Sequence, residues 1–142
     1  MAQVFVDWKN YSNQFRYSIK EMKQTGDFSD VTLVCEDGEI RAHRLVLSTG
    51  SRLLHKMLQD ARSTNNVEQK VQLKGILKGQ LDSLLDFMYN GECVVAQNEI
   101  EGFLKRGHIL GLVGLQDEEE QTTNRKYIEG QVSDKQLFVV EE

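Results

Sequence analysis

The chain has 142 residues, of which 39% are hydrophobic and 27% charged, and its formal net charge is −5. It is long and apolar enough for one domain with its own hydrophobic core. It lacks the run of about 18 apolar residues that a membrane-spanning helix needs, and its two cysteines exclude a disulfide-rich scaffold, so we expect no membrane contact and a reducing compartment.

The first predicted element is an isolated strand. Residues 4–8, Val-Phe-Val-Asp-Trp, are rich in β-branched and aromatic side chains. No neighbouring segment pairs with them as a hairpin, because residues 10–24 indicate a helix. In that helix the apolar side chains recur at spacings of three or four and form one stripe, made of Tyr11, Phe15, Ile19 and Met22. Gly26 is expected to end the helix.

A β-hairpin is predicted next. Residues 31–35 alternate as a strand with one buried face, and residues 36–38, Glu-Asp-Gly, suit a tight turn because glycine tolerates a positive φ. Residues 39–41 form the return strand, and Ala42-His43-Arg44 leads into a helical segment at residues 45–47. A second amphipathic helix follows, with its apolar face made of Leu53, Leu54, Met57, Leu58 and Ala61.

The second half of the domain begins after a polar loop at residues 62–66. Residues 69–73 predict a third strand, and a helix striped by Leu81, Leu84, Leu85 and Met88 stops at Asn90-Gly91. Residues 92–95 predict a short strand. Asn98 is a candidate cap for a last helix, in which Gly102, Gly107 and Gly111 each cost about 1 kcal/mol relative to alanine. Residues 112–115 close the fold.

The acidic charge lies in the tail. Residues 1–115 carry 14 acidic and 14 basic side chains, whereas residues 116–142 carry 8 and 3. We therefore expect a globular domain over 1–115 and an acidic, mostly disordered tail over 116–142, with a short apolar tetrad at 137–140. Because a neutral domain has no basic stripe for phosphate groups, we expect no direct nucleic-acid binding.

No pattern of catalytic or metal-binding residues is found in the sequence. The three histidines, His43, His55 and His108, are scattered, and no Cys/Asp ligand set lies near them. Ser48 and Ser51 lack the G-x-S-x-G elbow of a nucleophile and are better explained as helix caps. We therefore expect no catalytic, cofactor-binding or metal residues, no cofactor and no enzymatic activity, and we interpret Cys35 and Cys93 as buried free thiols.

The order of strand, hairpin, strand, Ala-His-Arg and helix resembles the BTB/POZ domain. Its pattern runs roughly F-x-D-V-x-L, a hairpin, then A-H-[RK]-x-[VL]-L-[SA]. The matching residues in this chain are Phe28, Asp30, Val31, Leu33, Ala42, His43, Arg44, Val46, Leu47 and Ser48.

Two further motifs are similar to the Tramtrack/Bric-à-brac type of BTB domain, known mainly from insect transcription and chromatin factors. Residues 4–10 resemble its F-x-L-x-W-x-N opening, and residues 84–95 resemble its L-L-[DE]-F-M-Y-x-G-E-V-x-V segment. Residues 49–54 depart from its A-C-S-P-[YF]-F sequence, and residues 107–110 depart from its A-E-S-L sequence. Members usually continue into zinc fingers, and we expect none within these 142 residues, because the cysteine count does not provide for them.

The resemblance implies an α+β fold, a small sheet flanked by a cluster of helices, in a strand-exchanged dimer. Residues 4–8 would cross to the partner, which resolves the aggregation hazard of an orphan apolar strand. The implied dimer interface comprises Val4, Phe5, Val6, Trp8, Phe15, Ile19, Met22, Cys93, Val94 and Val95. Asp30 and Arg44 would form a charged pair near the dimer centre, with a structural role or a combined structural and partner-reading role.

The implied function is homo-oligomerising protein–protein interaction in a nuclear transcription or chromatin regulator. The partners are a second copy, with tetramers or hexamers as a further level, and other BTB or co-regulator proteins. One alternative is a substrate adaptor of a cullin ubiquitin ligase, which the acidic sequence after residue 116 disfavours. Another is a stand-alone BTB protein that modulates larger partners.

Overall fold

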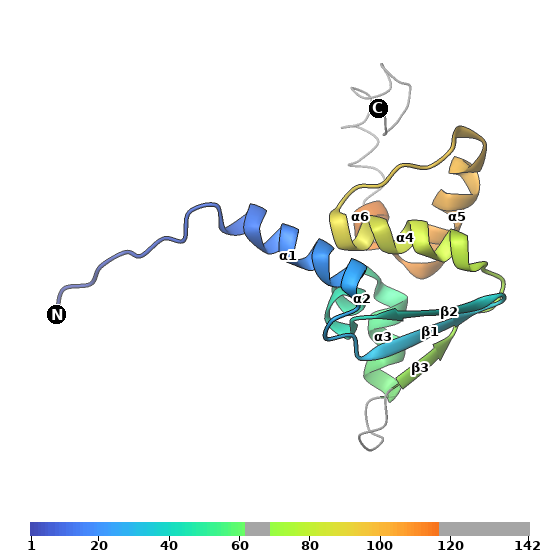
Figure 1. The fold of residues 1–142 in the computed structure, drawn as a ribbon, viewed down its shortest axis with the longest axis horizontal. Coiled ribbons are helices and arrows are strands. Elements are labelled where there is room, and N and C mark those ends of the chain that lie inside the picture. The colour runs from blue at the N-terminus through green and yellow to red at the C-terminus, as the bar shows by residue number, and fades with distance from the viewer. Residues whose placement is uncertain (62–68, 117–142) are drawn as a thin grey trace.

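A three-stranded sheet packs against a cluster of helices, and the chain start projects from one side of this body (Figure 1). The computed structural model describes residues 1–61 and 69–116, so the predicted loop at 62–66 and residues 117–142 of the predicted acidic tail lie outside the described residues. The predicted α+β class is confirmed. The elements in chain order are α1 (Tyr11–Thr25), β1 (Val31–Cys35), β2 (Gly38–Ala42), α2 (Arg44–Gly50), α3 (Arg52–Ala61), β3 (Gln69–Gln72), α4 (Lys78–Asn90), the 3₁₀ turn η1 (Gln97–Glu99), α5 (Ile100–Leu110) and α6 (Val113–Gln116).

The central strand of the sheet is β1, which pairs antiparallel with β2 and parallel with β3. Cys35 lies opposite Gly38, so the hairpin turn consists of residues 36–37. Gly38 begins β2 and does not adopt the positive φ that we expected. A Cβ at this position would lie 3.1 Å from Cδ of Lys78, so a larger residue would require this flexible side chain to shift.

The acidic hairpin turn also stabilises the start of α4. The Asp37 carboxylate accepts a hydrogen bond from the backbone N–H of Lys78 at 2.7 Å, and the Glu36 carboxylate accepts one from the N–H of Gly75 at 2.7 Å. The first N–H groups of a helix have no partner within the helix. Leu77, which precedes α4, has no side-chain acceptor, so Asp37 supplies one from a distant part of the chain.

The hydrophobic core lies between the sheet and the helices behind it. β1 is buried at four of its five positions, as expected for the central strand. A fully buried leucine stabilises a fold by about 1.5–3 kcal/mol, and most of the inaccessible side chains here are leucines. The largest are Leu33, Leu47, Leu54, Leu81, Leu84, Leu85 and Leu112.

Ser51 joins two parts of the helical cluster. It is fully buried between α2 and α3. Its hydroxyl accepts a hydrogen bond from the N–H of Leu54 at 3.0 Å and donates one to the carbonyl of Leu110 at 2.6 Å. The predicted capping role is therefore confirmed for Ser51. Ser48 bonds within α2, to the carbonyl of Leu45, and does not cap a helix start.

Helix α5, which we expected to be capped by Asn98, differs from expectation at both ends. Its entry is the turn η1, and its N-cap residue is Glu99, so Asn98 is not the cap. Gly111 lies beyond its end as the C-cap, with φ 66°. A left-handed backbone favours glycine, so Gly111 ends α5 without the penalty that we expected for a glycine inside the helix.

Residues 92–95 are not a strand within the part of the chain that the structure describes. The prediction was wrong for the single chain because a strand requires a hydrogen-bonded neighbour, and none of the described segments supplies one. Residues 4–8, which we expected to be an isolated strand, also lack a hydrogen-bonded neighbour among the described residues and are not a strand. Both segments have strand-like sequences, and neither is paired with a strand of the described residues.

Candidate association surface

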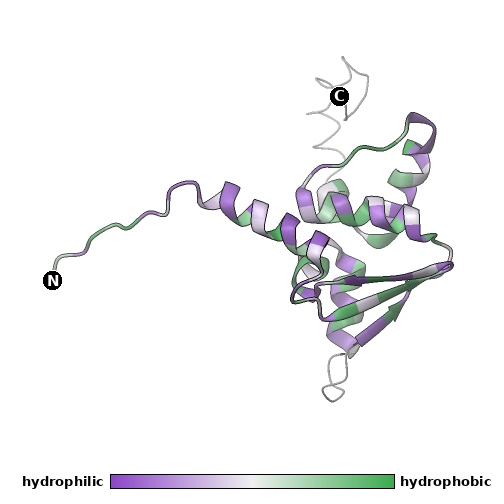
Figure 2. Cartoon of the chain, in the orientation of Figure 1, coloured by the Kyte–Doolittle hydropathy of each residue, from purple (hydrophilic) through white to green (hydrophobic). Residues whose placement is uncertain are grey.

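The N-terminal arm, residues 1–9, projects from the body and contains hydrophobic residues (Figure 2), and all of its residues are exposed. Val4, Phe5 and Val6 are 84%, 88% and 86% exposed. Isolated apolar residues on a surface are common, but three in succession on a projecting segment are a liability for a lone chain. The arm therefore presents a surface suited to burial against another molecule.

The arm joins α1 through a defined bend. Asn10 has φ 66°, and the N–H of Tyr11 donates to the carbonyl of Trp8 at 3.2 Å. The Trp8 ring packs edge-on against Tyr11, with ring centroids 4.7 Å apart, and its indole N–H donates to Oε1 of Gln14 at 3.0 Å. Trp8 is still 58% exposed, so it is a surface residue and not part of the core.

The apolar stripe of α1 is divided between the body and solvent. Ile19 and Met22, in its second half, are partly buried, and Ile19 packs against the core. Tyr11 and Phe15, in its first half, are exposed, with their rings stacked at 5.7 Å. The exposed half of the stripe continues from the arm, so both form one apolar surface.

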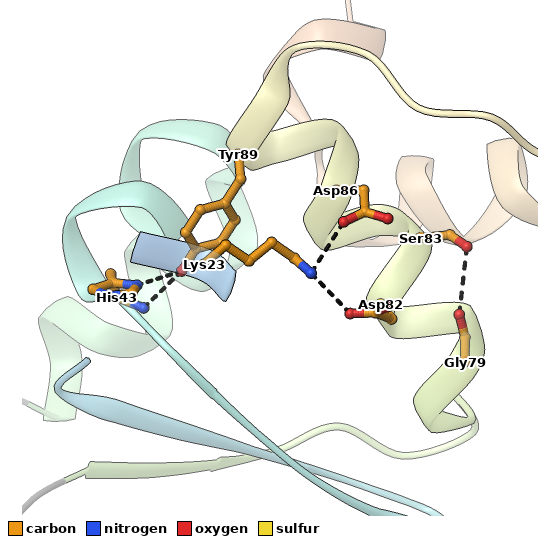
Figure 3. Close-up of polar contacts among 7 residues, drawn as sticks. All are labelled: Lys23, His43, Gly79, Asp82, Ser83, Asp86 and Tyr89. Carbon is orange, nitrogen blue, oxygen red and sulfur yellow. Dashed lines mark hydrogen bonds and ion pairs between the residues drawn. The ribbon is translucent and has the colours of Figure 1, made fainter. Parts of the chain in front are cut away.

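Polar contacts hold α1 on α4. The Lys23 ammonium lies 3.0 Å from carboxylate oxygens of both Asp82 and Asp86 (Figure 3). Partial burial lowers the pKa of Lys23, but hydrogen bonds and attraction to Asp86 and Asp82 outweigh burial and raise that pKa overall. These residues were not identified from the sequence. The available signal was the pair of like charges four residues apart in α4, which favours a cation between them.

Arg16 connects α1 to the segment after α4. Its Nε donates to the carbonyl of Asn90 at 3.1 Å, and its guanidinium lies 3.8 Å from the Glu92 carboxylate. A cation is favoured at this position because the C-terminal carbonyls of a helix carry partial negative charge. Arg16 thus fixes α1 relative to the start of segment 92–95.

Segment 92–95 alternates as a strand would. Cys93 and Val95 are partly buried against the core, whereas Val94 is 93% exposed. Burial raises the pKa of the Cys93 thiol to about 11, with Asp86 adding to the effect. The thiol is therefore protonated at neutral pH and has a packing role, in contrast to a reactive cysteine.

Asp30 and Arg44 meet, but not as the ion pair that we expected. Oδ1 of Asp30 accepts a hydrogen bond from the backbone N–H of Arg44 at 2.8 Å, and no ion pair joins the two side chains within residues 1–61 and 69–116. Asp30 is also exposed. A carboxylate at a helix start is stabilised by the unpartnered N–H groups and the helix dipole, so Asp30 serves as a cap for α2.

A shallow groove lies beside this cap. It has a volume of about 290 Å³, and its lining residues come from α2 and α3: Arg44, Leu45, Ser48, His55, Leu58 and Gln59. Leu45 is 67% exposed there.

In the described ranges, no group of three or more His, Cys, Asp or Glu side chains is placed to bind a metal ion. No helix of those ranges is long and apolar enough to span a membrane.

The sequence matches known proteins over most of its length. The pattern of the BTB/POZ domain matches residues 19–127. Three Drosophila melanogaster proteins are each 32% identical: Protein abrupt over 78% of this chain, Longitudinals lacking protein-like over 80% and Protein bric-a-brac 2 over 80%. The chain spans only 12% of abrupt and 10% of bric-a-brac 2, but 87% of Longitudinals lacking protein-like.

Two solved structures share the fold. The BTB (Tramtrack and Bric a brac) domain of human Gigaxonin has a TM-score of 0.67 at 20% identity, covering 82% of this chain and 94% of that domain. The BTB domain of zebrafish PATZ1 has a TM-score of 0.69 at 15% identity, covering 87% and 99%. At these identities the likeness concerns the fold alone.

Proposed function

The chain belongs to the BTB/POZ family, with relatives of the Tramtrack/Bric-à-brac type, and from this premise we propose that it is a homo-oligomerising protein–protein interaction domain of a nuclear transcription or chromatin regulator. One observation carries the proposal. The same chain has an exposed apolar arm and an unpaired, strand-like segment at residues 92–95, and the arm projects away from the body that holds this segment (Figure 1).

Exchange between two chains gives both segments a partner. The arm of one chain adds as a strand to residues 92–95 of the other, so the free backbone groups of both become hydrogen-bonded. Burial of each valine or phenylalanine contributes about 1.5–3 kcal/mol. The exposed half of the α1 stripe, Tyr11 and Phe15, extends the same contact and gives the dimer an apolar interface of the kind found in obligate pairs.

The groove beside Arg44 is the proposed place for partner reading. It combines a guanidinium, a solvent-exposed leucine at position 45 and the imidazole of His55. Such a mixture suits an extended peptide of another BTB or co-regulator protein, which offers both apolar and polar side chains. The role proposed for Asp30 is to hold the start of α2 so that this groove keeps its shape.

DNA contact is assigned to another polypeptide or to another part of a longer protein. Residues 1–115 have equal numbers of acidic and basic side chains, and phosphate binding depends on an excess of positive charge. The nuclear role therefore operates through association. A second candidate is a stand-alone modulator of larger BTB proteins, which the 87% coverage of Longitudinals lacking protein-like favours.

Light scattering of the chain at micromolar concentration tests the proposal. We expect at least twice the chain mass of 16.3 kDa. Val6→Asp places a charge in the exchanged strand and should shift the population towards monomer. Gln3→Asp adds the same charge just before the apolar residues 4–6 of the arm and is the matched control. A monomeric unaltered chain would rule out the proposed function.

A further inference from the structure

The bend between the arm and α1 is more ordered than a flexible tether would be. Asn10 adopts a left-handed backbone, and its side-chain oxygen accepts a hydrogen bond from Nδ2 of Asn13 at 3.0 Å. Trp8 is held twice, by its ring contact with Tyr11 and by its hydrogen bond to Gln14. We call residues 8–10 and these contacts the Trp8 elbow.

The elbow does not contribute to the hydrophobic core. Every residue from Met1 to Ser18 is exposed, so the contacts of Trp8 add no side chain to the buried core of the described residues. Apart from glycine, asparagine is one of the few residues that adopt a left-handed backbone, so residue 10 is suited to this bend. A defined bend outside the core, held by polar and ring contacts, is expected where the direction of the adjoining segment matters.

The elbow determines how the arm is rotated about its own axis. In an extended strand, successive side chains point to opposite faces, so Val4 and Val6 share the face of Trp8 while Phe5 lies on the other. Because Trp8 is held against Tyr11 and Gln14 of α1, the face that carries the two valines is set relative to α1. We infer that the Trp8 elbow is a positioning device that fixes which face of the exchanged arm meets a second copy of this chain.

This inference rests on the proposed exchange and adds a specificity determinant to it. A strand shifted by one residue turns all its side chains to the opposite face. An arm with the wrong face inward would bury Asp7 and expose both valines. The elbow therefore favours copies whose arm has the same spacing between its valines and Trp8.

Insertions between Asp7 and Trp8 test this inference. One inserted threonine reverses the faces, whereas the inserted pair Val-Asp restores them and repeats the local sequence. We expect the single insertion to raise the dimer dissociation constant by about tenfold or more, and the double insertion to change it by less than about threefold. A steady weakening with length, or equal constants for all three chains, would overturn the inference.

A second pair of variants tests the bend itself. Asn10→Gly keeps the left-handed backbone available, whereas Asn10→Val opposes it. We expect Asn10→Val to raise the dissociation constant about tenfold for each arm, and Asn10→Gly to have a smaller effect. Far-UV circular dichroism should show the same folded content in all variants. Equal constants for the two variants would count against the elbow.

Trp8 also provides a direct readout, because it is the only tryptophan of the chain. Diluting the protein from above to below its dimer dissociation constant should separate the chains and shift the Trp8 fluorescence emission. Asn10→Val should alter this emission even before dilution. If the unaltered chain is a monomer, the proposed exchange fails. If it is a dimer but the one-residue and two-residue insertions do not differ in dissociation constant, only the inference about the Trp8 elbow fails.

Discussion

The hydroxyl of Tyr89 makes two hydrogen bonds to His43, accepting one from the backbone N–H at 2.9 Å and donating one to ring Nδ1 at 2.7 Å (Figure 3). The other ring nitrogen, Nε2, lies 2.6 Å from the carbonyl oxygen of Asp27. A carbonyl only accepts, so Nε2 carries the proton and Nδ1 is left to accept. Both side chains are buried. The pair joins α4 to the start of α2, as a structural histidine at a helix entry would.

Tyr89→Phe should therefore destabilise the fold. The change removes one hydroxyl and leaves two buried polar groups of His43 without partners, at a cost of about 1–3 kcal/mol. Urea unfolding followed by circular dichroism measures the loss. Tyr17→Phe is the control, because Tyr17 is exposed on α1 and should change stability by less than about 0.5 kcal/mol. Equal midpoints for the two variants would contradict the role given to the pair.

The same tyrosine predicts how stability depends on alkaline pH. Burial raises the pKa of Tyr89 from 10.0 to about 12. Between these values the unfolded chain loses the phenol proton while the folded chain keeps it, so stability falls as pH rises. The unfolding free energy of the unaltered chain should fall more steeply from pH 10 to 12 than that of Tyr89→Phe. Parallel profiles would show that Tyr89 does not contribute to this dependence.

Two glycines in α5 should respond to alanine in opposite ways. A Cβ on Gly107 would lie 2.6 Å from Cδ1 of Leu115, whereas one on Gly102 would lie 3.0 Å from the movable end of Arg106. Gly107→Ala should destabilise by about 1–3 kcal/mol through overpacking, and Gly102→Ala should stabilise by up to about 1 kcal/mol through helix propensity. Thermal unfolding distinguishes them. Stabilisation by both would show that the contact with Leu115 relaxes freely.

Lys23 should matter more than its surface location suggests. Lys23→Met keeps the aliphatic stem but removes the cation that lies between Asp82 and Asp86, so the two carboxylates are left to repel each other. Because both carboxylates are partly exposed and can be solvated, we expect a loss of about 1 kcal/mol and faster amide hydrogen exchange in the second half of α1. Lys20→Met, on the exposed face of the same helix, is the control. Unchanged exchange in α1 would show that apolar packing alone holds it.

The sequence predicted the elements with local signals and missed contacts between distant residues. The end of α4 at Gly91 and the alternation of β1 follow from a few neighbouring residues, and the structure confirms them. The caps that Asp37 and Asp30 provide join residues 41 and 14 positions apart. Contacts between residues so far apart leave no periodic pattern in the sequence. For Asp30 and Arg44 the family resemblance implied a charged pair, but the Asp30 carboxylate accepts from the main-chain N–H of Arg44 and does not pair with its guanidinium.

Segment 92–95 shows the same limit at an interface. Its alternation was recognised, and the structure shows Cys93 and Val95 turned to the core and Val94 turned outward. A backbone ladder needs a hydrogen-bonded neighbour, and under the proposed exchange that neighbour is the arm of a second chain. If the proposed exchange occurs, the strand predicted at residues 92–95 forms only in the dimer, which is why it is missing from the single chain.

Association beyond the dimer is the last prediction, and it concerns Val94. After exchange, the arm and residues 92–95 form a ribbon whose outer edge still has free backbone groups. The chain contains no proline, and Lys9 is the one lysine beside the ribbon, so the usual obstacles to edge pairing are few. Val94→Lys should reduce tetramers or hexamers to dimers without unfolding the domain, as sedimentation velocity would show. Ile109→Lys places the same charge at an exposed position on α5 and should leave the oligomers intact. If the unaltered chain sediments only as a dimer at high concentration, the ribbon does not join dimers, and the exchange within the dimer is unaffected.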